Sequence, residues 1–251
     1  MLSTVISKKI KIQNGALVVG GQPVRRFKIL RELGRGASGI VFEAERSWLA
    51  QPCALKIWHK LRANDRRDKI RQGMSEARKI ADSDPDWVPH IYDADVINNT
   101  FVVSMELISG ETLKQLLSRQ HDKPALWHIA RAYISGVAAT SKPHVVHGDP
   151  HDRNVMSYLH TPSRFEQYSR LKFIDFGTST FINPRRSRDR HWNIVDRTFR
   201  RILKPFSTLS EWLELHGAAE RRTEELRVPY YYDVLDGLRL EAGLQETQHG
   251  I

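Results

Sequence analysis

Two acidic stretches, HGDPHDRN at residues 147–154 and FIDFG at residues 173–177, stand out in this sequence. Aspartate and asparagine supply the hard oxygen ligands that Mg²⁺ prefers, and an aspartate beside a hydroxyl can accept its proton. Phosphate transfer needs these groups, because it depends on positioning and charge neutralisation more than on covalent chemistry. We therefore expect Asp149 to act as the base toward an acceptor hydroxyl, and Asn154 and Asp175 to hold magnesium.

A glycine-rich segment, GRGASGIV, occupies residues 34–41. Glycines let a backbone come close to a phosphate and offer its N–H groups. Dinucleotide-binding folds share this spacing, but there the motif opens a helix. Here an apolar strand pattern follows, which favours a strand–turn–strand loop, with a plain hairpin turn as the alternative. The residues that we expect to contact a nucleotide are Gly34, Gly36, Ser38, Gly39 and Val41.

A cation for the phosphates is available at Lys56, on the next predicted strand. Twenty residues further on, Glu76 lies within residues 65–81, where apolar residues recur at the spacing of an amphipathic helix. This spacing predicts an ion pair between Lys56 and Glu76. The ordinary alternative for a helical glutamate is a solvated face.

The chain changes character along its length. Its first third is rich in strand patterns, including two strands around Asn14-Gly15, the strongest short-range signal for a hairpin. Further strands are expected at residues 26–30, 40–44, 52–58, 91–92, 100–105, 144–146 and 171–174, and helices at residues 112–119 and 125–139. We predict one α+β domain over residues 1–251, with an N-lobe at 1–107 that carries the extra hairpin and a C-lobe at 108–251.

In combination, these motifs resemble the protein-kinase-like superfamily, over about residues 26–204. The resemblance implies a bilobal fold, with an antiparallel-sheet N-lobe containing one helix, a mostly helical and shortened C-lobe, and MgATP in the cleft. It places Met105 at the gatekeeper position and implies that backbone groups of Glu106 and Ile108 bind adenine. Ala54 is then a further nucleotide contact.

The chain departs from regulated protein kinases at several positions. Gly148 stands where many of them have an arginine, His151 stands where serine/threonine kinases have a lysine, and no Ala-Pro-Glu element follows residue 177. These features are similar to RIO kinases, to the small kinase of tRNA threonylcarbamoylation, and to aminoglycoside, choline or lipopolysaccharide-core kinases. In such compact members Asp196 would bond the loop around Asp149 from beneath, unless it is simply a helix-face residue. The acceptor, a protein Ser/Thr or a small-molecule, lipid or glycan hydroxyl, stays open.

Composition limits the partners. The chain has 39 Lys and Arg against 29 Asp and Glu, a net charge of +10, and no apolar run long enough to span a membrane. A single cysteine, Cys53, and the lack of a signal-peptide pattern predict a cytoplasmic protein. Basic clusters lie at residues 60–79 and 185–204, and the second either steers an anionic substrate or partner or is a solvated face.

Three functions are therefore weighed. The first is an active kinase with ATP and Mg²⁺, and the second is a pseudokinase or nucleotide-binding scaffold for a protein or nucleic-acid partner. Retention of Lys56, Asp149, Asn154 and Asp175 together favours the active kinase. A nucleic-acid-binding protein has only the net charge in its favour, because no RNA-binding motif is present.

Overall fold

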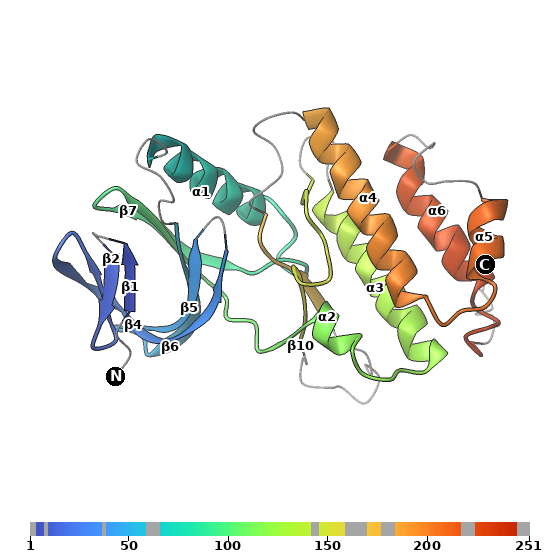
Figure 1. Cartoon of the computed structure of the whole chain (residues 1–251), viewed down its shortest axis with the longest axis horizontal. Coiled ribbons are helices and arrows are strands. Elements are labelled where there is room, and N and C mark those ends of the chain that lie inside the picture. Colours follow the sequence, from blue (N-terminus) through green and yellow to red (C-terminus); the bar gives the residue numbers. More distant parts are fainter. Residues whose placement is uncertain are drawn as a thin grey trace. The chain divides into compact units, whose positions relative to one another are not determined.

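The structure is a computed structural model, and it describes residues 4–7, 10–36, 39–58, 66–141, 146–158, 170–176, 184–216 and 224–244. The chain divides into two compact units, Met1–Ile108 and Ser109–Ile251. Figure 1 shows strands predominating in the first unit and helices in the second, which is the α+β kinase-like class predicted from the sequence.

The first unit contains one eight-stranded antiparallel sheet, in the order β1-β2-β3-β4-β5-β6-β8-β7. One helix, α1 (Arg66–Ala81), packs against β7 and β8. The strands are β1 (Thr4–Ser7), β2 (Ile10–Gln13), β3 (Ala16–Val19), β4 (Gln22–Arg35), β5 (Ile40–Arg46), β6 (Gln51–Ile57), β7 (Ile91–Ile97) and β8 (Thr100–Met105).

The hairpin predicted around Asn14-Gly15 is confirmed as β2 and β3. Gln13 pairs with Ala16, and both turn residues have positive φ angles, 52° at Asn14 and 78° at Gly15, as a two-residue hairpin turn requires. One face of the sheet is apolar, and its alternate residues, such as Phe42 on β5, are fully buried. This apolar face makes the extra strands part of the same core as the central ones.

The second unit combines a small sheet with helices. Its sheet has the order β11-β10-β9, and α3 packs against α4, α6 and β11. The elements are β9 (Gly110–Thr112), α2 (Leu113–Leu116), α3 (Lys123–Thr140), β10 (Val155–Tyr158), β11 (Arg170–Phe173), α4 (Pro184–Ile202), α5 (Leu209–Leu215) and α6 (Glu224–Gly237). None of the helices in the described ranges is both long and apolar enough to cross a bilayer.

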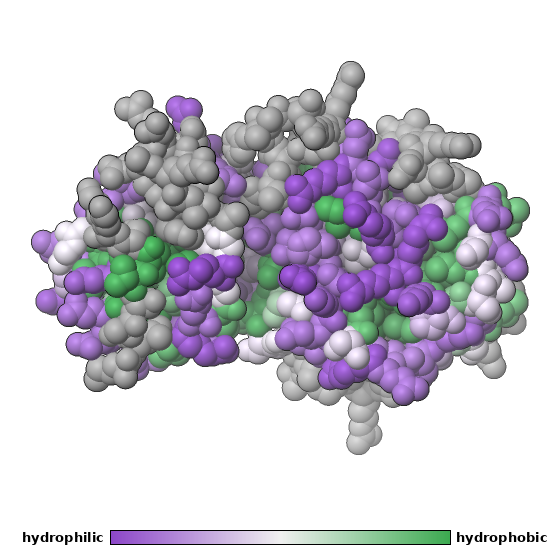
Figure 2. Space-filling view, in the orientation of Figure 1, coloured by the Kyte–Doolittle hydropathy of each residue, from purple (hydrophilic) through white to green (hydrophobic). Residues whose placement is uncertain are grey.

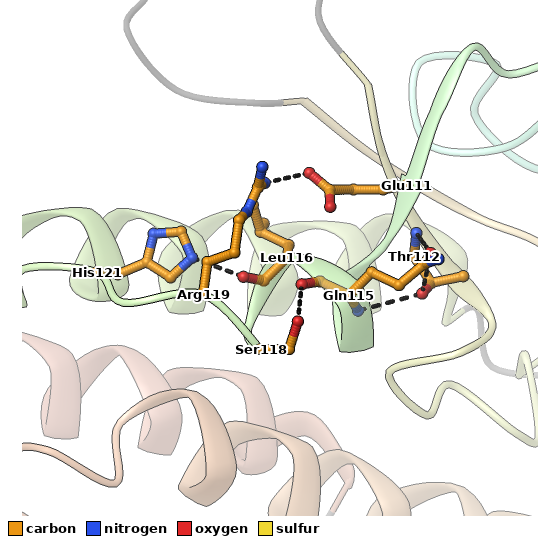
Figure 3. Close-up of polar contacts among 7 residues, drawn as sticks. All are labelled: Glu111, Thr112, Gln115, Leu116, Ser118, Arg119 and His121. Carbon is orange, nitrogen blue, oxygen red and sulfur yellow. Dashed lines mark hydrogen bonds and ion pairs between the residues drawn. The ribbon is translucent and has the colours of Figure 1, made fainter.

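Helix α2 is shorter than the predicted 112–119. Thr112 and Gln115 form a capping box at its start, in which the Thr112 hydroxyl accepts the Gln115 N–H and the Gln115 side chain accepts the Thr112 N–H (Figure 3). At the other end the Ser118 hydroxyl donates to the Gln115 carbonyl at 2.6 Å. Such a side-chain bond offers the backbone an alternative to the helical pattern, and the helix ends at Leu116, after one turn.

The predicted strand at residues 144–146 is not found at Val146, which lies outside any strand; residues 144 and 145 are outside the described ranges. The peptide at Val146 instead leads directly into the loop at residues 146–154, which we call the acidic loop. That loop precedes β10, and β10 pairs with β11 from Val155↔Phe173 to Tyr158↔Arg170.

Near the end of the second unit, the Glu241 carboxylate gathers several donors. It accepts hydrogen bonds from Lys123 Nζ at 2.5 Å, from the N–H groups of Ser207 and Thr208 at 2.7 and 3.1 Å, and from both of their hydroxyls. Burial by itself would raise the pKa of Glu241, but the hydrogen bonds from Lys123, Thr208 and Ser207 outweigh it and hold this pKa well below its usual range. The cluster ties the start of α3 to the turn before α5.

We expect Glu241→Gln to lower the free energy of unfolding at pH 7 by about 1 to 2 kcal/mol, because hydrogen bonds to a charged group are stronger than those to an amide. The difference in free energy of unfolding between wild type and variant has its full size above the pKa of an unfolded glutamate, about 4.3. It is lost as the pH falls through the lower pKa of the folded state, so the two proteins converge in acid. Urea denaturation at several pH values measures the difference.

Glu214→Gln is the matched control, because Glu214 lies exposed on α5. It should leave the free energy of unfolding unchanged within about 0.5 kcal/mol. Equal stability of Glu241→Gln and wild type at pH 7 would show that the cluster contributes nothing net.

Candidate active site

The first unit holds a buried ion pair. Lys56 on β6 and Glu76 on α1 are 5% and 2% exposed, and Lys56 Nζ lies 2.5 Å from Glu76 Oε1. This is the contact that the twenty-residue spacing predicts. Burying two charges costs free energy, and a buried ion pair often adds no net stability to a fold. The stability of this unit therefore does not by itself explain why the pair is there. Lys56 Nζ also lies 4.7 Å from the centre of the Trp58 ring, which favours a cation at this place.

The glycine-rich segment forms a strand–turn–strand loop, as predicted, between β4 and β5. The Gly36 N–H donates to the Gly39 carbonyl at 2.9 Å, while Ser38 lies outside the described residues. Gly39 is needed because a Cβ there would lie 2.3 Å from the Ile57 carbonyl oxygen on β6. A Cβ at Gly34 or Gly36 would meet nothing within 4 Å. Packing within the unit therefore explains the third glycine and not the first two.

The other residues predicted to bind nucleotide lie on neighbouring strands of the same sheet. Val41 on β5 pairs with Lys56, and Ala54 on β6 pairs with Met105 at the end of β8. Directly after β8, the Glu106 N–H donates to the His90 carbonyl at 2.8 Å, and the His90 N–H donates to the Glu106 carboxylate. The structure therefore engages the Glu106 N–H within the unit.

The hydrogen bond from the Glu106 N–H to His90 affects the adenine contacts expected after β8. Ile108 is the last residue of the first unit. Because the N–H of Glu106 already donates to His90, it is not offered to an adenine, and the backbone contacts expected at Glu106 and Ile108 stay a prediction.

In the second unit, the acidic loop is organised around His147, which is fully buried. Its Nε2 donates to the Ile174 carbonyl at 2.9 Å, and its Nδ1 accepts the Asp149 N–H at 3.2 Å. Burial lowers the pKa of His147 to about 4, so the ring is neutral at physiological pH, as one donor and one acceptor nitrogen require. His147 thus connects the first acidic motif to the second.

Asp149 and Asn154 are held together within the loop. Asn154 Nδ2 donates to the Asp149 carbonyl at 3.0 Å, and the Asn154 N–H donates to the His151 carbonyl at 2.8 Å. The Asp149 side chain is 12% exposed, and its Oδ2 lies 3.2 Å from an Arg190 nitrogen and 3.8 Å from His151 Nε2. The carboxylate is therefore fixed in position and still reaches the surface of the unit.

Asp175 follows Ile174, whose N–H donates to the Asn154 carbonyl at 2.8 Å and so continues the β10–β11 ladder by one residue. Its φ angle is +61°, a left-handed conformation that costs a non-glycine residue of order 1–3 kcal/mol. The next residue, Phe176, is fully buried with its ring centre 4.2 Å from that of His147. Packing of Phe176 thus keeps Asp175 in a strained turn beside Asn154.

Helix α4 contacts the acidic loop at three points. Arg190 pairs with Asp149, Arg201 pairs with Asp152, and His191 Nδ1 accepts the Gly148 N–H at 3.3 Å. His191 is fully buried, which lowers its pKa to about 3 and keeps it a neutral acceptor. Sequence reasoning missed His191, because nothing in the sequence distinguishes a histidine that accepts a backbone N–H from an ordinary core histidine.

The prediction that Asp196 bonds the acidic loop is wrong. One carboxylate oxygen of Asp196 accepts from Arg200 Nε at 2.6 Å on the same helix, and the other is buried without a hydrogen bond in the described part of the chain. His191, one and a half turns earlier on α4, takes the backbone contact that was assigned to Asp196. A neutral imidazole can do so without burying a charge beneath the loop.

Comparisons with known proteins agree with this geometry. The chain belongs to the protein kinase domain family, whose model matches residues 27–200. It is 28% identical over 170 residues to the serine/threonine-protein kinase PrkC of Bacillus subtilis, covering 66% of this chain and 25% of PrkC. It is 23% identical over 176 residues to PknL of Mycobacterium tuberculosis, covering 65% of this chain and 44% of PknL.

The chain thus spans between a quarter and a half of the length of these two curated relatives. Among solved structures, the kinase domain of Mycobacterium tuberculosis PknI superposes with a TM-score of 0.60, covering 84% of this chain and 95% of that domain. At 13% identity this likeness shows the fold alone. The finer resemblance to RIO and small-molecule kinases stays a prediction.

We expect Gly148→Ala to destabilise the chain by about 1 to 2 kcal/mol, because a Cβ at its φ of +85° meets the neighbouring carbonyl oxygen. Gly34→Ala is the matched control, with open space around the added methyl and no positive φ. It should change stability by less than about 0.5 kcal/mol. Urea denaturation measures both, and equal stability of the two variants would contradict the strained conformation at residue 148.

Proposed function

We propose that this chain transfers the γ-phosphate of MgATP to a serine or threonine hydroxyl of a protein. The observation that carries the proposal is the Asp149 carboxylate, which reaches the surface of its unit from a loop whose backbone is fixed at Gly148, Asp149 and Asn154. A fixed carboxylate at hydrogen-bond reach of a hydroxyl can accept its proton during transfer. A scaffold that only binds a partner has no need of this arrangement.

The first unit supplies groups suited to a nucleotide. Lys56 is held by Glu76 as a buried cation, and a cation of this kind can neutralise phosphate charge without reorganising. Gly34 and Gly36 leave open space beside the loop backbone, which suits close approach of phosphates. The backbone after β8, at Glu106 and Ile108, suits hydrogen bonding to adenine.

Asn154 and Asp175 fit Mg²⁺. Because Asn154 Nδ2 donates to the Asp149 carbonyl, its Oδ1 is the amide atom left for a cation, and the ladder bond from Ile174 brings Asp175 next to it. No group of three or more His, Cys, Asp or Glu that could hold a metal occurs within the described ranges. Two protein ligands are enough here, because Mg²⁺ is usually completed by phosphate oxygens and water. When bound, the ion neutralises charge on the phosphates.

The acceptor is inferred from the relatives. PrkC of Bacillus subtilis, pkn2 of Myxococcus xanthus and PknL of Mycobacterium tuberculosis are all described as serine/threonine-protein kinases. In the step we propose, the hydroxyl oxygen bonds to the γ-phosphorus, the bond to the β–γ bridging oxygen breaks, and ADP leaves. The hydroxyl proton passes to the Asp149 carboxylate and then to solvent.

We expect Asp149→Asn to lower phosphate transfer by about 10²- to 10⁴-fold, because the amide cannot accept the hydroxyl proton. Asp175→Ala and Lys56→Met should each lower it strongly, Asp175→Ala together with a higher Mg²⁺ requirement. The assay follows label from γ-labelled ATP into the chain itself, an acidic and a basic test protein, and an aminoglycoside. Phosphoamino-acid analysis then identifies the labelled hydroxyl.

Asp189→Asn is the matched control, since Asp189 lies exposed on α4. It should transfer phosphate as wild type does. Label found only on the aminoglycoside would overturn the protein acceptor. Tight nucleotide binding with no transfer to any acceptor would favour the pseudokinase or scaffold instead, and an active Asp175→Ala would overturn the metal assignment.

A further inference from the structure

One charge beside Asp149 is not explained by the folding of the second unit. Arg190 lies on α4 with its side chain 55% exposed, and one of its terminal nitrogens lies 3.2 Å from Asp149 Oδ2. Figure 2 shows hydrophilic residues gathered over α4, on the face where this helix is visible. The arginine end of this pair is more than half exposed, so water screens it and its contribution to stability is small. Its position beside Asp149 therefore invites a functional explanation as well.

Within the described ranges the guanidinium of Arg190 has one ion-pair partner, Asp149. The comparable pair between Arg201 and Asp152 joins the same helix to the same loop, which already fixes α4 against the loop without Arg190. A guanidinium presents five N–H donors in a planar fork, a geometry that suits phosphate oxygens.

The electrostatics of the proposed reaction favour a cation at this place, in addition to Lys56 and the metal ion. Asp149 is negative, and the phosphoryl group that approaches its hydroxyl partner carries negative charge on three oxygens. Two such groups within a few ångströms repel each other strongly in a partly buried site. The other basic group near the carboxylate, His151, is 3.8 Å away and is charged only when protonated.

We propose that Arg190 is a further catalytic residue, whose guanidinium donates to an oxygen of the transferred phosphoryl group while it stays beside Asp149. This rests on the proposed function, and it adds the residue that offsets repulsion between the base and the phosphoryl group. Arg190 makes and breaks no covalent bond and keeps its proton throughout. The hydroxyl proton still goes to Asp149, and ADP still leaves with the bridging oxygen.

The test uses Arg190→Met, which removes the charge at similar length, and Arg190→Lys, which keeps a charge without the fork. Arg197→Met is the matched control, because Arg197 is two turns further along α4 and its Nε donates to the Asn193 carbonyl of the same helix. Two readouts are taken: kcat and KM for transfer from MgATP, and calorimetric affinities for ADP and for a non-hydrolysable ATP analogue, both with Mg²⁺.

For Arg190→Met we expect kcat to fall by about 10²- to 10³-fold, the loss typical of one preorganised donor. Affinity for the ATP analogue should fall about tenfold while affinity for ADP is unchanged, because only the analogue carries a γ-phosphate. Arg190→Lys should recover part of both losses, and Arg197→Met should match wild type.

Several results would overturn the assignment. If Arg190→Met leaves kcat unchanged, Arg190 is dispensable, and if it raises kcat, Arg190 blocks Asp149 in the wild type. If the affinities for ADP and for the analogue fall equally, the role of Arg190 is only structural. If Arg190→Met does not fold, an Arg190→Lys variant with wild-type kcat and wild-type analogue preference overturns the role of the fork. If the wild type transfers no phosphate, the proposed function fails. The affinity for the ATP analogue relative to that for ADP, compared between wild type and Arg190→Met, then still decides whether Arg190 binds the γ-phosphate.

Discussion

The neutral imidazole of His147 is the interaction on which the acidic part of the site depends. One nitrogen donates to the Ile174 carbonyl, just before Asp175, and the other accepts the N–H of Asp149. A charged ring could not make both contacts, because it would have no acceptor nitrogen. Burial excludes the charged form, so the same packing that hides the ring also fixes two aspartates that are far apart in the sequence.

The same packing also holds the strained backbone of Asp175 in place. Its left-handed backbone would relax if Phe176 were free to move, but Phe176 is buried against the His147 ring. The turn is therefore kept by apolar contacts one residue away from the carboxylate. Strained residues held in this way are typical of binding and catalytic sites, because their surroundings determine their conformation.

Support for the loop comes from α4 as well as from its own hydrogen bonds. In this chain only residues 178–183 separate the second acidic motif from the start of α4. The helix contributes a neutral acceptor at His191 and cations at Arg190 and Arg201, each to a different residue of the loop. These three contacts all come from one regular helix, so the position of α4 helps to set the conformation of the loop.

Much of this arrangement could be predicted from sequence, and the reason differs between elements. The Asn14-Gly15 hairpin and helix α1 follow from local signals, a turn dipeptide and a 3.6-residue period, so they are confirmed nearly residue by residue. The pairing of Lys56 with Glu76 follows from their spacing on two predicted elements.

What the sequence could not predict are contacts that depend on the rotation of one element against another. Asp196 and His191 lie five positions apart on α4, and which of them faces the loop is decided by how the helix packs on α3. Helix α2 ends at Leu116, and two residues later the Ser118 hydroxyl bonds the Gln115 carbonyl, a local contact that the helical period does not reveal.

The backbone at Gly148 limits how this chain could change in evolution. An arginine at this position would keep the backbone N–H that donates to His191, but it would have to adopt a left-handed conformation that disfavours every residue with a Cβ. The strained turn at Asp175 shows that such a conformation is kept where a neighbouring side chain is packed in place. A regulatory arginine at residue 148 would therefore carry a cost in stability that glycine avoids.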